Sequence, residues 1–289
     1  MTRLKRALVA LIGATGAAFI YGLIRLFGRR HRPGDVGWLV GPLGGATIGE
    51  RVYEETASRE GLTLIRHAPE GGLIPSFDVL ARPGFDPARV HPKIRDFYQR
   101  THAFRLDTWS TTYFPARLAL WVLVTTISRR VEQLNFPIDG LETAHGMTSE
   151  IALMHDAGGA LRYTGWLRKL QRSGNVIYSG FYMTVRPPLV DGACVKVVFP
   201  MPDGNATVIL RPDHHGTSGL RLESVGRGFG DAGFYRVQRD GDGLRVWRIT
   251  TLHERFVLYV DGEDTVRCEH DVTFLGMRVL TLHYRISPA

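Results

Sequence analysis

The sequence contains few cysteines. Only two occur in 289 residues, Cys194 and Cys268. Two are too few for a disulfide framework or for a zinc site of the CxxC type, and neither is expected. We favour two separate buried thiols, and one disulfide between neighbouring strands is the alternative.

Acidic residues are absent from the first 32 positions, which carry seven Lys or Arg residues. The whole chain has 36 basic and 28 acidic residues, so 29 basic and 28 acidic residues remain beyond position 32. The net charge of +8 therefore comes almost entirely from the N-terminus. A nucleic-acid-binding domain needs a basic surface, and the nearly neutral remainder argues against one.

Recognisable catalytic signatures are also lacking. There is no G-x-S-x-G nucleophile turn and no H-E-x-x-H zinc motif. Gly228–Gly233 satisfies G-x-G-x-x-G, but the following residues 234–237 resemble a strand instead of the helix that a dinucleotide site requires. We interpret it as a glycine loop between strands, and we predict no metal and no cofactor.

The N-terminus contains the longest uncharged run. Ala7–Ile24 has 18 uncharged residues with basic residues on both sides, and no small-x-small cleavage site follows it. We predict an uncleaved single-pass anchor that contacts the membrane through residues 7–27. The basic residues flanking the run slightly favour a cytoplasmic location for the rest of the chain.

Small residues line one side of this predicted helix, at Ala10, Ala14 and Ala18. Such a stripe would allow two anchors to pack closely as a homodimer. Alanine is also simply common in membrane helices, which is the alternative.

Composition divides the chain into four predicted regions. Residues 1–32 form the anchor with its basic flanks, and the Gly/Pro-rich residues 33–47 form a linker. Residues 48–145 are predicted as a helical cap region, and residues 146–289 as an antiparallel β domain. Within the cap region the apolar residues 115–135 predict a helix that plugs or caps the β domain, or lies in the membrane interface.

Short alternating runs separated by Gly, Asp and Asn turns dominate the C-terminal half. They predict a mainly β (α+β) fold, an antiparallel β-barrel or sandwich of about ten strands, with N-terminal helices and one membrane anchor helix. The strand-like runs are Thr148–His155, Leu161–Leu170, Asn175–Val185, Cys194–Pro200, Thr207–Arg211, Leu220–Val225, Gly233–Arg239, Leu244–Thr251, Arg255–Val260, Thr265–Phe274 and Val279–Ile286.

Candidate site residues lie on these runs. In the last run, apolar residues alternate with His283 and Arg285. If the polar face points outward these are surface residues, and if it points into a barrel they line a cavity. In the second case His283 and His253 are candidate catalytic acid–base residues. The candidate ligand-binding residues, aromatic or basic as in mostly apolar pockets, are Tyr163, Trp166, Tyr178, Tyr182, Arg186 and Arg285.

Several segments together resemble a known family. They are Arg129–Asn135, Tyr163–Arg168, Gly180–Tyr182, Val197–Pro200, Gly204–Val208, Gly230–Tyr235 and Leu282–Arg285. Over residues 90–286 the chain resembles the uncharacterised bacterial YndJ-like family. The resemblance implies a self-contained module, sometimes attached to membrane segments, and it transfers no catalytic residue.

Three functions are compatible with these features. The first is a membrane-anchored module that binds a hydrophobic small molecule or lipid in its β cavity. The second is a cofactor-independent cyclase or isomerase that acts on a polyketide- or lipid-like substrate in that cavity. The third is a structural partner of another membrane protein, which would need an exposed apolar patch instead of a cavity.

Overall fold

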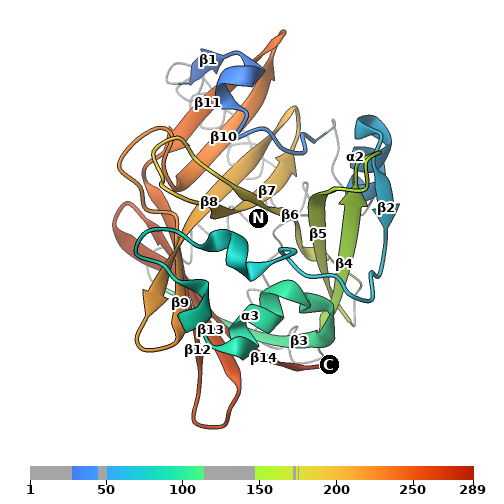
Figure 1. The fold of residues 1–289 in the computed structure, drawn as a ribbon. Helices are drawn as coiled ribbons and strands as arrows, with labels where there is room; N and C mark the ends of the chain where they lie inside the picture. Colours follow the sequence, from blue (N-terminus) through green and yellow to red (C-terminus); the bar gives the residue numbers. More distant parts are fainter. Residues whose placement is uncertain (1–27, 45–50, 114–146, 172–173, 175) are drawn as a thin grey trace, which may run out of the picture.

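The chain folds mainly into antiparallel β-strands, as the sequence predicts. The computed structural model describes residues 28–44, 51–113, 147–171, 174 and 176–289 (Figure 1). Strands β1 to β7 span Arg29–His31, Thr63–Ile65, Phe104–Thr112, Met147–His155, Leu161–Leu170, Val176–Val185 and Cys194–Met201. Strands β8 to β14 span Gly204–His215, Gly219–Glu223, Gly233–Asp240, Gly243–Ile249, Leu252–Val260, Val266–Phe274 and Met277–Pro288. The two described α-helices are α2, Val52–Glu60, and α3, Pro92–Gln99.

The described strands form one open, hydrogen-bonded sheet of fourteen strands, not about ten. The eleven predicted runs correspond to β4 through β14. The additional strands come from the N-terminal part: β1 pairs with β11, β2 with β4, and β3 with β14. β1 and β2 have only three residues each, too few to show a period-two pattern. Residues 104–112 were expected within a helical region, but they form the long edge strand β3.

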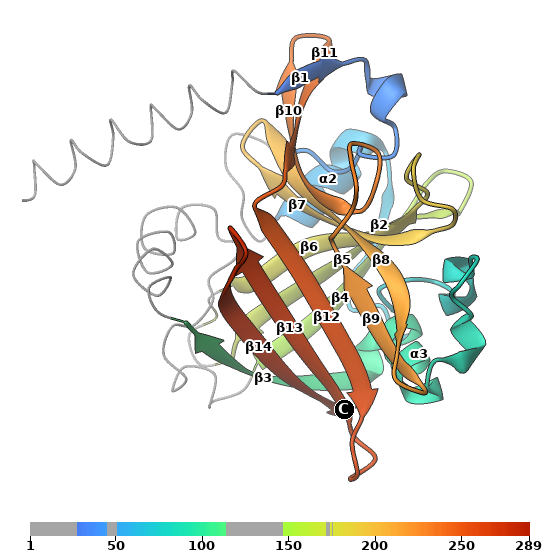
Figure 2. The same ribbon diagram turned by 90° about the vertical axis from the view of Figure 1, so that its left-hand side faces the viewer.

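Strand β8 divides the sheet into two layers. Its first half pairs with β7 and β10, and from Arg211 onward it pairs with β9. We call the part running β2-β4-β5-β6-β7-β8 the first sheet, with β10, β11 and β1 attached to it. The part running β8-β9-β12-β13-β14-β3 is the second sheet. Figure 2 shows β12, β13, β14 and β3 in front of β4, β5 and β6, so the architecture is sandwich-like.

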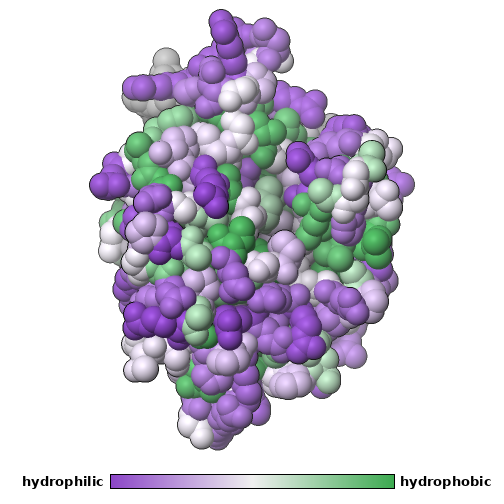
Figure 3. Space-filling view, viewed as in Figure 1, coloured by the Kyte–Doolittle hydropathy of each residue, from purple (hydrophilic) through white to green (hydrophobic). Residues whose placement is uncertain are grey.

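The strands alternate between a buried and a more polar side, because successive residues point to opposite faces. Figure 3 shows hydrophilic residues over most of one molecular face, with hydrophobic residues in smaller groups between them.

The main core lies between the sheets and includes α3 through Ile94, Phe97 and Tyr98. Helix α3 begins with Pro92, and the His91 side chain accepts a hydrogen bond from the backbone N–H of Lys93.

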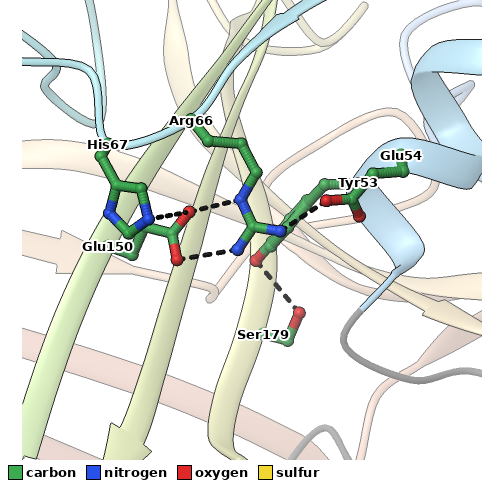
Figure 4. A network of polar contacts seen from close by, with 6 residues as sticks. All are labelled: Tyr53, Glu54, Arg66, His67, Glu150 and Ser179. Carbon is green, nitrogen blue, oxygen red and sulfur yellow. Dashed lines mark hydrogen bonds and ion pairs between the residues drawn. The ribbon is translucent and has the colours of Figure 1, made fainter.

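Helix α2 packs on the outer side of the first sheet. The ring of Tyr53 lies so close to Gly165 that a Cβ atom there would be 2.5 Å from it. The Ser179 hydroxyl donates a 3.0 Å hydrogen bond to the Tyr53 hydroxyl (Figure 4). Arg66 binds Glu54 of α2 and Glu150 of β4 at 2.5 Å each, which attaches the helix to the sheet.

Residues 33–44, part of the predicted linker, lie on the outer side of the first sheet. Val36 and Leu39 are buried there, and Gly44 N donates a 2.8 Å hydrogen bond to Gly204 O. We call residues 36–44 the strap. The Lys196 ammonium donates hydrogen bonds to Trp38 O at 3.0 Å and to Val40 O at 2.6 Å.

Several sequence predictions fall outside the described residues. These are the anchor over residues 7–24, its alanine stripe and the apolar helix over residues 115–135. Within the described ranges, no helix combines the length and apolar character needed to cross a bilayer. Cys194 and Cys268 are both free and buried, as we favoured.

Candidate functional site

A cavity of about 910 Å³ lies between the two sheets. The first sheet contributes residues of β5, β6 and β7, the second contributes β12, β13 and β14, and α3 closes one end. At the other end the lining includes Phe274, Leu275 and Met277, which are 44%, 61% and 54% exposed. The cavity therefore reaches the surface at the turn between β13 and β14.

The alternation of the strands determines which side chains face this space. Alternate residues of β12 line it, namely Leu252, Glu254, Phe256 and Leu258. Alternate residues of β14 do the same, namely Leu280, Leu282, Tyr284 and Ile286. Most of the lining is apolar, which is typical of sites for small hydrophobic ligands.

Polar side chains interrupt the apolar lining, among them Thr108, Ser110 and Arg278. We call six others, which lie on β5, β6 and β12 to β14, the cavity polar cluster. They are Arg168, Tyr178, Tyr182, Glu254, His270 and Tyr284. Both sheets contribute, since the first three come from β5 and β6 and the others from β12, β13 and β14. Binding sites of mostly apolar character use such isolated polar groups to orient a ligand.

Arg168 is the cation of the cluster and is only 5% exposed. It donates a 2.9 Å hydrogen bond to Thr108 Oγ1, and its guanidinium carbon lies 5.6 Å from the ring centroid of Tyr284. Its Nε has no hydrogen-bond partner within the described part of the chain. Burial lowers the pKa of Arg168, although an arginine keeps its charge at neutral pH.

The tyrosines of the cluster are neutral hydrogen-bonding groups. The Tyr178 hydroxyl donates a 2.8 Å hydrogen bond to the Tyr182 hydroxyl. Burial raises the pKa of Tyr178 well above its usual value, and nearby Tyr182 and Glu254 raise it further. Burial likewise raises the pKa of Tyr284.

Glu254 and His270 form an acid–base pair inside the cavity. The His270 Nε2 lies 3.8 Å from Glu254 Oε2, which is longer than a hydrogen bond. Burial raises the pKa of Glu254 to about 7 and lowers the pKa of His270 to about 3. At neutral pH the imidazole is therefore neutral, and the carboxyl group is close to its titration midpoint.

Three of the predicted ligand-binding residues line the cavity: Trp166, Tyr178 and Tyr182. Tyr163 lies on the opposite side of β5, in a smaller apolar cluster, and its hydroxyl donates a 2.8 Å hydrogen bond to Glu60. Arg186 follows the last residue of β6, is exposed and does not line the cavity. Tyr163 and Arg186 are therefore separated from the cavity.

The predicted catalytic histidines lie outside the cavity. His283 and Arg285 alternate with the inward-facing residues of β14, so they occupy its outer side, where His283 stacks on Trp109 at 5.7 Å. His253 alternates in the same way with the inward-facing residues of β12. The prediction that His253, His283 and Arg285 line the cavity is therefore wrong, because the apolar face of each strand points inward.

Arg168, Glu254 and His270 line the cavity but were not among the predicted site residues. Glu254 shares its strand face with the apolar Leu252 and Phe256, so alternation alone would have placed it inside. The same signal was available for His270, whose face includes Cys268.

One curated relative matches nearly the whole chain. It is the "Uncharacterized membrane protein YndJ" of Bacillus subtilis (strain 168), 26% identical over 284 residues. The match covers 93% of this chain and 49% of YndJ, so the chain spans about half the length of that relative. No family model matches the chain, and no solved structure matches it. The similarity to YndJ confirms the YndJ-like resemblance that the sequence predicts.

Proposed function

We propose that this protein binds a hydrophobic small molecule or lipid in the cavity between its sheets. The observation that carries the proposal is the size and lining of that cavity, about 910 Å³ and mostly apolar. Protein interiors are normally packed as densely as organic crystals, with few voids larger than a water molecule. A space of this volume lies within the range of ligand sites.

The similarity to YndJ supports a membrane location, because the name of that relative describes a membrane protein. It agrees with the predicted anchor and with contact through residues 7–27. We propose a single-pass topology with most of the chain in the cytoplasm.

A neutral fluorescent probe, N-phenyl-1-naphthylamine, tests the proposal on the purified full chain. Val272 lines the cavity from β13, and the next residue, Thr273, does not. We expect Val272→Phe to weaken probe binding at least tenfold, since the larger ring occupies the ligand space. The matched control Thr273→Phe should bind the probe as the wild type does.

Organic extraction of the full chain, purified from its own host, provides a second measurement. A co-purifying hydrophobic compound that is depleted in Val272→Phe would support the proposal. Absence of both probe binding and extracted compound would refute it, and would favour a structural partnership with another membrane protein.

A cofactor-independent isomerase or cyclase is the second candidate, and Glu254 favours it. A carboxyl group with a pKa of about 7 inside an apolar cavity is suited to accept and return protons at neutral pH. His270 is neutral, and its Nε2 lies 3.8 Å from the Glu254 carboxyl group, from where it could form a hydrogen bond with a bound substrate. Once an extracted compound is identified, Glu254→Gln should abolish its conversion if the cavity is catalytic, and should leave binding intact.

A further inference from the structure

We propose that the ligand is an amphiphile with one anionic head group, which Arg168 binds, and with an apolar chain held by the rest of the lining. This inference rests on the proposed cavity function and specifies its ligand class. The chemistry shared by a carboxylate head and a phosphate-ester head is the negative charge, and the experiment below distinguishes the two.

The first step is that Arg168 is buried and has no counter-ion among the described residues. No carboxylate of the described residues lies within the 4.0 Å limit for an ion pair with it. Its partners are the neutral Thr108 hydroxyl, at 2.9 Å, and the Met147 sulfur, at 3.5 Å. Burying a charge is costly unless the charge is paired, so an anion bound beside Arg168 would make a favourable interaction.

The second step is that the unused hydrogen-bonding capacity of Arg168 is available beside the cavity. Its Nε is buried and has no partner among the residues that the structure describes, although a guanidinium has five N–H donors in a planar fork. That fork matches two oxygens of a carboxylate or phosphate, which is why arginine is preferred for such groups. Arg168 itself lines the cavity.

The third step concerns the neighbouring tyrosines. The Tyr178–Tyr182 pair makes one mutual hydrogen bond from two hydroxyl hydrogens, so one hydrogen is left for a ligand oxygen. Tyr284 lies next to the guanidinium on the opposite sheet. These neutral donors suit an anion, because they add hydrogen bonds without a competing negative charge.

The fourth step is the position of these groups along the cavity. In the second sheet, Thr108, the hydrogen-bond partner of Arg168, is paired with Tyr284. Glu254 lies nearer the open end, since it is paired with Val272 of β13, which is close to the turn between β13 and β14. Toward the other end of these strands the lining includes Leu106, Leu258 and Ile286, which suit an alkyl chain.

The test uses the purified full chain in nanodiscs of phosphatidylcholine. Four compounds with the same alkyl chain compete with N-phenyl-1-naphthylamine: tetradecanoate, tetradecyl phosphate, tetradecanol and tetradecyltrimethylammonium. We expect at least one anion to bind tenfold or more tightly than the alcohol, and the cation to bind most weakly. Preference for tetradecanoate identifies a carboxylic acid, and preference for tetradecyl phosphate identifies a phosphate lipid.

Arg168→Met should reduce anion affinity at least tenfold and leave alcohol affinity unchanged, whereas the outer-face control Arg285→Met should change neither. A purely structural arginine would lower both affinities together. The wild-type selectivity decides the question even if Arg168→Met does not fold. Equal binding of all four compounds would overturn the anion inference and leave the proposed function standing, whereas failure of the probe itself would refute the proposed function.

Discussion

Arg168 on β5 donates a hydrogen bond to Thr108 on β3 at 2.9 Å, so a single side chain connects the two sheets where they face each other across the cavity. β3 and β5 are not hydrogen-bonded neighbours in the sheet order. The contact therefore holds together two layers whose continuous connection runs through β8, on the far side of the cavity.

Thr108→Val removes the acceptor of this hydrogen bond and keeps the shape of the side chain. We expect the free energy of unfolding to fall by about 1–3 kcal/mol, because a buried charged donor loses its partner. Urea unfolding followed by tryptophan fluorescence measures the change. Thr111→Val on the exposed side of the same strand is the control, and an equal loss in both variants would contradict the role of the contact.

Glu254 and His270 make opposing contributions to stability as the pH changes. The pKa of Glu254 rises from 4.5 to about 7 on folding, so the folded state binds the extra proton and stability falls as the pH rises through this interval. The pKa of His270 falls from 6.5 to about 3, so the unfolded state binds the extra proton and stability rises with pH up to 6.5. Between pH 4.5 and 6.5 the two effects cancel.

Single variants should reveal each contribution. With Glu254→Gln, relative to the wild type, the free energy of unfolding should rise by about 1.4 kcal/mol per pH unit between pH 4.5 and 6.5. With His270→Phe it should fall by a similar amount over the same interval. Urea unfolding at several pH values measures both, and identical profiles for wild type and variants would contradict the opposing shifts.

Lys196 should control the attachment of the strap to the first sheet. Burial lowers the pKa of its ammonium to about 7, and its nitrogen supplies hydrogen bonds to two strap carbonyl groups, those of Trp38 and Val40. Lys196→Met leaves both carbonyl groups without this donor. We expect faster amide hydrogen exchange in residues 36–44 at pH 8, with little change in β12, β13 and β14.

The control for this experiment is Lys93→Met, which removes a lysine that is 44% exposed and pairs with Asp264. It should leave exchange in the strap unchanged. Unchanged exchange in Lys196→Met as well would mean that apolar burial of Val36 and Leu39 alone holds the strap.

The strands of the C-terminal half were predictable because each shows local alternation bounded by turn residues. Strand β14 is the clearest case, with apolar Leu280 and Leu282 separated by Thr281. The pairing of β1 and β2 was not predictable, because three-residue strands are defined by distant partners. The Gly/Pro content of residues 33–44 predicts a linker, and nothing local reveals that Lys196, over 150 positions later, binds two of its carbonyl groups.

The candidate site was predictable only in part. The aromatic residues Trp166, Tyr178 and Tyr182 were identified by composition, and they line the cavity. The titratable residues were chosen by residue type, which favoured His253 and His283. On both strands, however, the apolar residues that alternate with these histidines face the cavity, so the histidines lie on the outer face. Strand alternation was therefore a better guide than residue chemistry.

Strand β8 belongs to both sheets. The backbone of β8 passes without interruption from the first sheet to the second at Arg211. The residues that face the cavity in one sheet therefore determine which residues face it in the other. A single residue inserted between Leu210 and Arg211 would reverse this relation, since a shift of one residue moves every side chain to the opposite face. The number of residues in β8 therefore determines which side chains enter the cavity from each sheet.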